Sequence, residues 1–188
     1  TGTIAISPIL LVIALWIYKD SPGPVIFKHR RIGKNGKEFN CYKFRSMCVD
    51  AKEKLEQLLK TNMEAKAEYE KYHKLENDPR VTKCGKFLRK TSIDELPQIF
   101  NVLKGEMSLI GPRPYMVSEY QEEKDLLKNI IIAKPGITGY WQVSGRNDVT
   151  FKERIAMEEW YVTNWNLWID LVILYKTFKV VLFRKGAY

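Results

Sequence analysis

An apolar segment near the N-terminus constrains this chain more than any other feature. Residues 3–18 read TIAISPILLVIALWIY, and the first charge after them is Lys19. At about 1.5 Å per residue, a helix of this length reaches only about 22 Å, which is less than the hydrocarbon core of about 30 Å. Pro8 removes a backbone donor and clashes with the preceding turn, so Ser7-Pro8 predicts a kink. We therefore favour a bent, re-entrant membrane helix whose two ends lie on one side of the bilayer.

The charges that follow this segment predict its orientation. Lys19, Lys28, Arg30 and Arg31 come directly after it, and the positive-inside rule places such a cluster in the cytoplasm. A buried core helix and a membrane span that is only partly contained in this chain are the two alternatives that stay open. We do not expect a secretory signal, because no basic leader or small-residue cleavage site is visible.

Length and charge limit the classes of protein that fit. A chain of 188 residues has room for one domain with a core plus appendages. Lys and Arg outnumber Asp and Glu by 31 to 22, and the formal charge of +9 favours an anionic partner such as nucleic acid, an anionic membrane or a phosphorylated substrate. Cys41, Cys48 and Cys84 form no CxxC pair and have no histidine at ligand spacing, which argues against a disulfide framework or a zinc site.

A β-hairpin is predicted just after the apolar segment. The breaker residues at 21–24 (SPGP) end the predicted membrane helix, and a short strand begins over 25–27. Residues 33–36 (GKNG) form a turn, and the alternating run at 38–44 then predicts the second strand.

The remainder of the chain is expected to be mainly helical, which gives an α+β fold. Residues 50–76 predict an amphipathic helix with a solvated charged face, and residues 93–103 and 153–161 predict two further helices. The segment 164–183 is apolar but interrupted by charges, so we expect an amphipathic helix that lies in the membrane interface.

Two adjacent carboxylates lie in the densest group of chemically useful residues. Asp94 and Glu95 follow Ser92, and the spacing of Ser92 and Glu95 predicts a capping box at a helix start. In a first turn the helix dipole favours ionised carboxylates, and successive residues diverge by about 100°. One carboxylate can therefore face a phosphorus atom while the other holds a metal. The alternative is that both acids only cap the helix.

Several cations accompany this pair. Arg89 precedes Asp94 by five residues, and Arg113 lies between two prolines whose fixed φ limits its backbone. Arginine forks match phosphate oxygens in geometry. Lys43, Arg45 and Arg146 are further candidates beside small or turn residues, although each of them alone is more typical of a surface charge.

Four segments resemble a known family. They are YKFRSM at 42–47, LRKTSIDELPQIFNVLKGEMSLIGPRP at 88–114, KPGITGYWQVSGRN at 134–147 and RKGAY at 184–188. In this order they are similar to the bacterial sugar transferase family, the monotopic polyprenyl-phosphate phosphoglycosyl transferases. The similarity covers nearly the whole chain, including the Ser7-Pro8 kink, and is greatest to the undecaprenyl-phosphate galactose and glucose phosphotransferases.

The resemblance implies a two-step exchange. Asp94 would attack the sugar-bearing phosphate of a UDP-sugar and expel UMP, and undecaprenyl phosphate would then collect the phosphosugar in the first step of surface glycan assembly. Glu95 would bind Mg²⁺, which neutralises the diphosphate. The resemblance also implies ligands for phosphate or uridine groups: Arg89, Arg113 and Arg146, with Lys43 and Arg45 as further candidates.

The resemblance further implies an organisation and a location. Residues 1–22 would be the re-entrant helix, and residues 23–188 a cytoplasmic catalytic domain at the inner membrane, in contact with membrane lipids. The basic stretch that usually precedes the family's membrane helix is missing here, and larger members carry further N-terminal spans, so we expect that Thr1 is not the native start. Galactose is the favoured sugar, from the similarity of 145–148 and 184–188 to hexose-transferring members. Pairing with a second copy is left open.

Two other interpretations compete with this one. A non-catalytic basic module could bind a membrane surface or nucleic acid, but the positive charge is spread along the chain and no nucleic-acid motif is present, so we expect no nucleic-acid partner. A one-step transfer in which Asp94 positions the metal and forms no covalent bond is the other.

Overall fold

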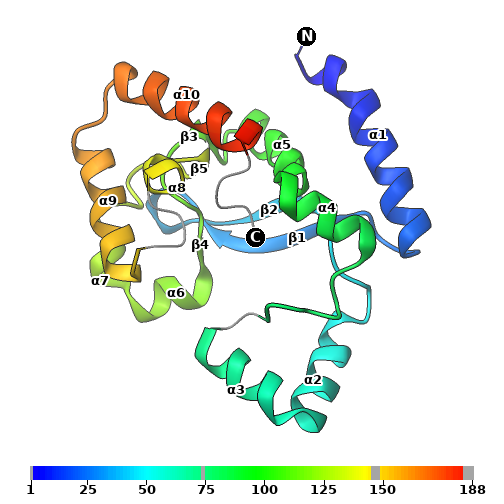
Figure 1. The fold of residues 1–188 in the computed structure, drawn as a ribbon. Helices are drawn as coiled ribbons and strands as arrows, with labels where there is room; N and C mark the ends of the chain where they lie inside the picture. Colours follow the sequence, from blue (N-terminus) through cyan, green and yellow to red (C-terminus); the bar gives the residue numbers. More distant parts are fainter. Residues whose placement is uncertain (1, 73–74, 145–148, 184–188) are drawn as a thin grey trace. The chain divides into compact units, whose positions relative to one another are not determined.

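The chain forms helices and small sheets in two compact units. A computed structural model describes residues 2–72, 75–144 and 149–183 (Figure 1). Unit 1 comprises Thr1–Ile26 and Phe44–Asp94, and unit 2 comprises Phe27–Lys43 and Glu95–Tyr188. The expected α+β class, dominated by helices, is confirmed.

Helix α1, Gly2–Asp20, contains Pro8 and forms the first element of unit 1. Among the helices of the described ranges, none combines the length and the hydropathy needed to cross a membrane. The kink at Ser7-Pro8 and the re-entrant path stay predictions.

The remaining helices of unit 1 are α2 (Ala51–Thr61), α3 (Met63–Tyr72) and α4 (Lys83–Thr91). The prediction of a single helix over 50–76 is wrong, because the helical segment is interrupted at Asn62. The Asn62 side chain accepts a hydrogen bond from the backbone N–H of Ala65 at 2.9 Å. Asparagine competes with the helix for backbone partners in this way and favours a cap position.

Helix α4 was not predicted, and it packs against the end of α1. Its backbone N–H at Cys84 donates to the Asp20 carboxylate at 2.8 Å, and the rings of Trp16 and Phe87 lie 5.3 Å apart. A Cβ atom on Gly85 would lie 1.9 Å from the carbonyl oxygen of Ser46, so only glycine allows this approach of α4 to the backbone.

The helical unit predicted over 93–103 is confirmed, although it consists of two helices of different type. Ser92 adopts a left-handed conformation with φ of 56° and ends α4, so the predicted capping box at Ser92 is wrong. The 3-10 helix η2 (Ile93–Gln98) comes next and contains Pro97, followed by α5 (Ile99–Leu103). Proline has no N–H and clashes with the carbonyl four residues earlier, which disfavours an α-helix at this position.

The predicted hairpin is confirmed. Strand β1 (Ile26–Ile32) and strand β2 (Glu38–Phe44) are joined through the short 3-10 helix η1 (Lys34–Gly36). A third strand, β4 (Tyr115–Met116), pairs antiparallel with β1 and gives the order β2-β1-β4.

A second sheet of unit 2 joins β3 (Ser108–Ile110) and β5 (Gly136–Thr138) in parallel. The predicted helix over 164–183 is confirmed as α10 (Leu167–Phe183), which lies against this sheet (Figure 1). The predicted helix over 153–161 lies within α9 (Phe151–Thr163). The other helices of unit 2 are α6 (Val117–Glu122), α7 (Lys124–Leu127) and α8 (Tyr140–Ser144).

We predict that Gly85→Ala destabilises the protein by about 2 kcal/mol or more, since the backbone of α4 or of Ser46 must move to admit the methyl group. Urea unfolding measures this change. Lys86→Ala, at the exposed next residue of α4, is the control and should stay within about 0.5 kcal/mol of the wild type. Equal stability of the two variants would contradict the close approach.

Candidate active site

The acidic pair occupies the first turn of η2. Asp94 and Glu95 are consecutive residues of this short helix, and both are half-buried. The expected first-turn position is therefore confirmed, although the turn is a 3-10 turn. Asp94 is the last residue of unit 1, and Glu95 begins the second segment of unit 2.

Arg89 lies in the last turn of α4, within unit 1. Its Nε donates a hydrogen bond to the Ser46 hydroxyl at 2.9 Å. Burial lowers the pKa of Arg89, and the negative charges of Asp94 and Asp78 oppose this shift. The Arg89 guanidinium is thus partly desolvated and within electrostatic range of the Asp94 carboxylate, and its role as a phosphate ligand stays a prediction.

Arg45 is buried at the turn that follows α1. Its guanidinium donates to the Ser21 hydroxyl at 3.3 Å and also to the Ser21 carbonyl oxygen. Gly23, which has φ of +135°, lies close to the same guanidinium. These contacts stabilise the breaker segment at 21–24, and the role of Arg45 as a substrate ligand stays a prediction.

Lys43 and Glu95 form an ion pair in unit 2. The Lys43 Nζ lies 2.6 Å from Glu95 Oε1, and the side chains are 28% and 31% exposed. The Glu95 carboxylate is therefore paired with the Lys43 ammonium, and both groups remain partly exposed to solvent.

Asn101, on α5, was not recognised from the sequence. It is fully buried, accepts a hydrogen bond from the Tyr42 N–H at 3.0 Å and donates to the Asn40 carbonyl and to Glu106, both at 2.7 Å. These bonds attach β2, which carries Lys43, to the helix that follows η2. A single Asn carries no sequence signal for such a role.

Arg113 lies between β3 and β4, and a buried carboxylate fixes its backbone. The Arg113 N–H donates to Glu158 Oε1 at 2.7 Å, and the Tyr115 hydroxyl donates to Glu158 Oε2. Burial raises the pKa of Glu158 to about 7, opposed by these hydrogen bonds and by the charges of Arg154 and Arg113. The sequence did not predict the buried position of Glu158, because glutamates are normally exposed.

The carboxylates of Asp94 and Glu95 fit one mode of magnesium binding. In the described parts of the chain, no three His, Cys, Asp or Glu side chains gather closely enough to hold a metal by themselves. Mg²⁺ commonly uses one or two carboxylates, with waters and substrate phosphates as its remaining ligands. The Glu95 carboxylate is partly exposed and can supply one such ligand, provided that the Lys43 ammonium gives way to the metal. Arg146 lies outside the described residues.

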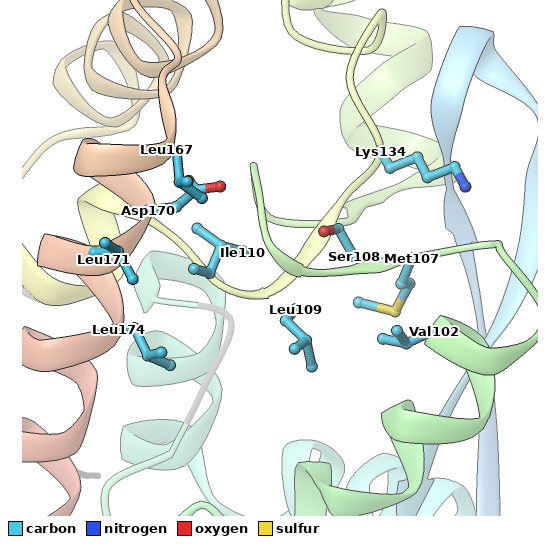
Figure 2. A pocket seen from close by; sticks show the side chains of 10 residues that line it. All are labelled: Val102, Met107, Ser108, Leu109, Ile110, Lys134, Leu167, Asp170, Leu171 and Leu174. Carbon is cyan, nitrogen blue, oxygen red and sulfur yellow. The ribbon is translucent and has the colours of Figure 1, made fainter.

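An apolar hollow of about 400 Å³ lies elsewhere in unit 2, between α10 and the segment from α5 to β3 (Figure 2). Leu109, Leu171 and Leu174 line it, with Lys134 and Asp170 as charged members. The Asp170 carboxylate accepts hydrogen bonds from the Tyr161 hydroxyl at 2.7 Å and from the Trp165 indole at 3.0 Å, so part of its hydrogen-bonding capacity is already used.

Comparisons with known proteins identify the family. The family model described as bacterial sugar transferase matches residues 1–184, and the chain belongs to this family. An uncharacterized sugar transferase of Haemophilus influenzae is 55% identical over 100% of this chain and 40% of its own length.

Two further relatives carry functional names. The undecaprenyl-phosphate galactose phosphotransferase of Salmonella typhimurium is 53% identical over 97% of this chain and 38% of its own length. The exopolysaccharide production protein ExoY of Rhizobium meliloti is 44% identical over 97% of this chain and 80% of its own length. The chain thus spans about two fifths of the first two relatives and most of the third.

We predict that Glu158 makes the protein less stable as the pH rises. Because the native pKa is about 7 and the ordinary value is 4.5, the folded state keeps a proton that the unfolded state has released between these pH values. The free energy of unfolding should therefore fall over this window, by an amount on the order of 3 kcal/mol from this group.

Urea unfolding between pH 4.5 and pH 8 tests this effect. Glu158→Gln should remove this part of the pH dependence, while Glu122→Gln, at an exposed acid of α6, should keep it. Parallel pH profiles for the two variants would mean that Glu158 ionises as an ordinary surface acid does.

Proposed function

We propose that the protein transfers a hexose-1-phosphate from a UDP-sugar to undecaprenyl phosphate, giving undecaprenyl-diphosphate-sugar and UMP. The observation that carries this proposal is the Asp94–Glu95 pair in the first turn of η2, in a chain that belongs to the bacterial sugar transferase family. The name of the Salmonella relative supports undecaprenyl phosphate as acceptor and galactose as the sugar. The name of the Rhizobium relative supports a role in making surface polysaccharide.

The transfer proceeds in two displacements at one phosphorus atom. An Asp94 carboxylate oxygen attacks the sugar-bearing phosphorus, the bond from that phosphorus to the bridging oxygen breaks, and UMP leaves with that oxygen. An oxygen of the lipid phosphate then attacks the same phosphorus and releases the Asp94 carboxylate. Splitting the exchange in this way lets one site use both phosphorylated substrates in turn.

Charge neutralisation is the main physical requirement, since an anionic carboxylate must approach an anionic diphosphate. Arg89, half-buried and within electrostatic range of Asp94, supplies positive charge from unit 1. Lys43 supplies it in unit 2, where it holds Glu95 at 2.6 Å. Mg²⁺ bound at Glu95 would add further positive charge on the diphosphate.

The membrane partner is supported by α10. Its exposed aromatic side chains include Trp168 at 73%, Tyr175 at 60% and Phe178 at 63% exposure. The amphipathic rings of Trp168 and Tyr175 suit the boundary between headgroups and acyl chains, and the apolar ring of Phe178 suits the acyl side of it. We infer that α10 rests on the cytoplasmic face of the membrane that holds the lipid acceptor.

We predict that purified protein with Mg²⁺ and undecaprenyl phosphate releases UMP from UDP-galactose. Asp94→Asn and Glu95→Gln should each lower the rate by roughly a thousandfold or more, because the nucleophile or the metal ligand is lost. Asp125→Asn, at an exposed acid of α7, is the control and should retain the wild-type rate.

Mass spectrometry of the wild type, quenched before acceptor is added, should show one phosphohexose on Asp94. An active Asp94→Asn variant would overturn the covalent route. Release of UMP from UDP-glucose in place of UDP-galactose would reassign the sugar and leave the reaction class intact.

We predict that introducing charge on α10 weakens membrane binding. Trp168→Asp combined with Phe178→Asp should lower association with anionic vesicles by about tenfold or more, because two exposed rings of this helix are lost. Met63→Asp, at an apolar side chain of α3 that is 78% exposed, adds one negative charge away from α10; it is the control for a single added charge and should bind as the wild type does. Equal vesicle binding by the α10 double variant and by Met63→Asp would argue against α10 as the contact surface. Co-flotation with vesicles measures the association.

A further inference from the structure

Three arginines of unit 2 surround one carboxylate. Arg31 of β1, Arg113 between β3 and β4, and Arg154 of α9 place guanidinium nitrogens 4.0, 3.6 and 3.8 Å from the Glu119 carboxylate of α6. We call these three arginines the arginine cluster. They come from three separate segments of the chain, so their convergence was not visible in the sequence.

The arginine cluster is poorly solvated. The side chains of Arg31, Arg113 and Arg154 are only 10%, 25% and 13% exposed. Burial lowers the pKa of Arg31 and of Arg154, and the positive charge of Arg113 lowers both further. Like charges are therefore held near one another where water screens them weakly, which costs stability unless an anion compensates.

The described acidic neighbours compensate this charge incompletely. Glu119 must serve all three arginines, and one of its oxygens also accepts a hydrogen bond from the Met116 N–H at 2.6 Å. Glu158 is only partly ionised at neutral pH, because burial raises its pKa to about 7.

The neighbouring histidine also reflects a surplus of positive charge. Burial and the charges of Arg31, Lys43 and Arg113 lower the pKa of His29 to about 4, with Glu119 opposing the shift. His29 is therefore neutral at pH 7, and its Nδ1 accepts a hydrogen bond from Arg31 at 3.2 Å.

Aromatic rings hold Arg154 without adding negative charge. Its guanidinium lies 4.7 Å from the ring centre of Phe151 and 5.2 Å from that of Trp141. No described residue accepts a hydrogen bond from the buried Arg154 Nε. A guanidinium held by rings, with donor capacity left over, is prepared to bind an oxyanion.

We propose that Arg31, Arg113 and Arg154 form a binding site for a diphosphate, with Glu119 orienting the guanidiniums until the ligand displaces it. The distances of 3.6 to 4.0 Å to Glu119 exceed the roughly 2.7–2.9 Å of a strong charge-assisted hydrogen bond, so the forks are not committed to this carboxylate. The inference rests on the proposed function and deepens it, since the ligand would be the diphosphate of the nucleotide donor.

The strand β1 offers a matched pair of variants. Successive residues of a strand point to opposite faces. Arg30 accordingly has a side chain 76% exposed and pairs with Glu38 at 2.6 Å, whereas its neighbour Arg31 points into the arginine cluster. Arg31→Gln and Arg30→Gln each remove one positive charge. A difference in affinity between the two variants therefore arises from where the arginine lies and not from the net charge.

Calorimetric titration of the whole chain with UDP and with inorganic pyrophosphate, at fixed salt concentration, tests the site. Arg31→Gln should weaken both affinities by about tenfold or more, and Arg30→Gln should leave them within about twofold of the wild type. Equal affinities in the two variants would overturn the site. A prenyl monophosphate is titrated in parallel, and a loss of affinity in Arg31→Gln for this ligand alone would also overturn the site, because the cluster would then recognise the acceptor.

Arg154→Lys keeps the test decisive where Arg31→Gln fails to fold. This variant retains the charge and removes the planar fork, so both affinities should fall by at least threefold, and an unchanged affinity would overturn the site. The same proteins separate this inference from the proposed transfer. If the protein releases UMP but Arg31→Gln leaves the affinity for diphosphate unchanged, the arginine site is wrong and the proposed transfer stands. If Arg31→Gln weakens the affinity for diphosphate tenfold but the wild type releases no UMP, the arginine site stands and the proposed transfer is wrong.

Discussion

The left-handed conformation of Ser92, which ends α4, is the constraint on which the candidate site depends. A residue other than glycine in the left-handed region costs roughly 1 kcal/mol, and here the Ser92 N–H bonds to the carbonyl oxygens at the end of α4. Because α4 ends there, Asp94 and Glu95 enter the first turn of a new helix. Had α4 continued, the two acids would lie near a helix C-terminus, where the dipole disfavours negative charge.

Buried polar side chains then fix the positions of the backbone segments that carry Lys43 and Arg113. Asn101 joins β2 to α5, and Glu158 holds the Arg113 backbone. Each of these side chains is at most 1% exposed, so loss of either would leave buried donors or acceptors without partners. The cost of such a loss restricts the positions of Lys43 and Arg113 more tightly than apolar packing alone would.

Local signals in the sequence predicted some elements well. The hairpin follows from turn residues at 33–36 and alternation over 38–44, and the helix over 164–183 follows from an apolar run of sufficient length. The prediction failed where a single residue overrides its surroundings, as Asn62 does within the helix predicted over 50–76. The helical unit over 93–103 was predicted, but the sequence did not show that its first part, which contains Pro97, is a 3-10 helix.

The candidate site was predictable only where its residues are neighbours in the sequence. Asp94 and Glu95 were found because they are adjacent, and Arg113 because two prolines flank it. Arg31 and Arg154 lie far apart in the chain and come together only in the fold. Charged residues are usually exposed, so nothing in the sequence distinguished these two from surface arginines.

The ion pairs of this protein differ in how firmly their partners are engaged. Arg80 binds Asp78 through three contacts of 2.6 to 3.1 Å, a saturated geometry that suits a structural role. Lys43 makes one contact of 2.6 Å to Glu95, and both side chains are about a third exposed. Glu119 engages its three arginines only at 3.6 Å or more. Because a ligand must outcompete the existing partner, phosphate can enter most readily at the Glu119 set, whose contacts are the longest, whereas a cation at Glu95 must displace one short contact from Lys43.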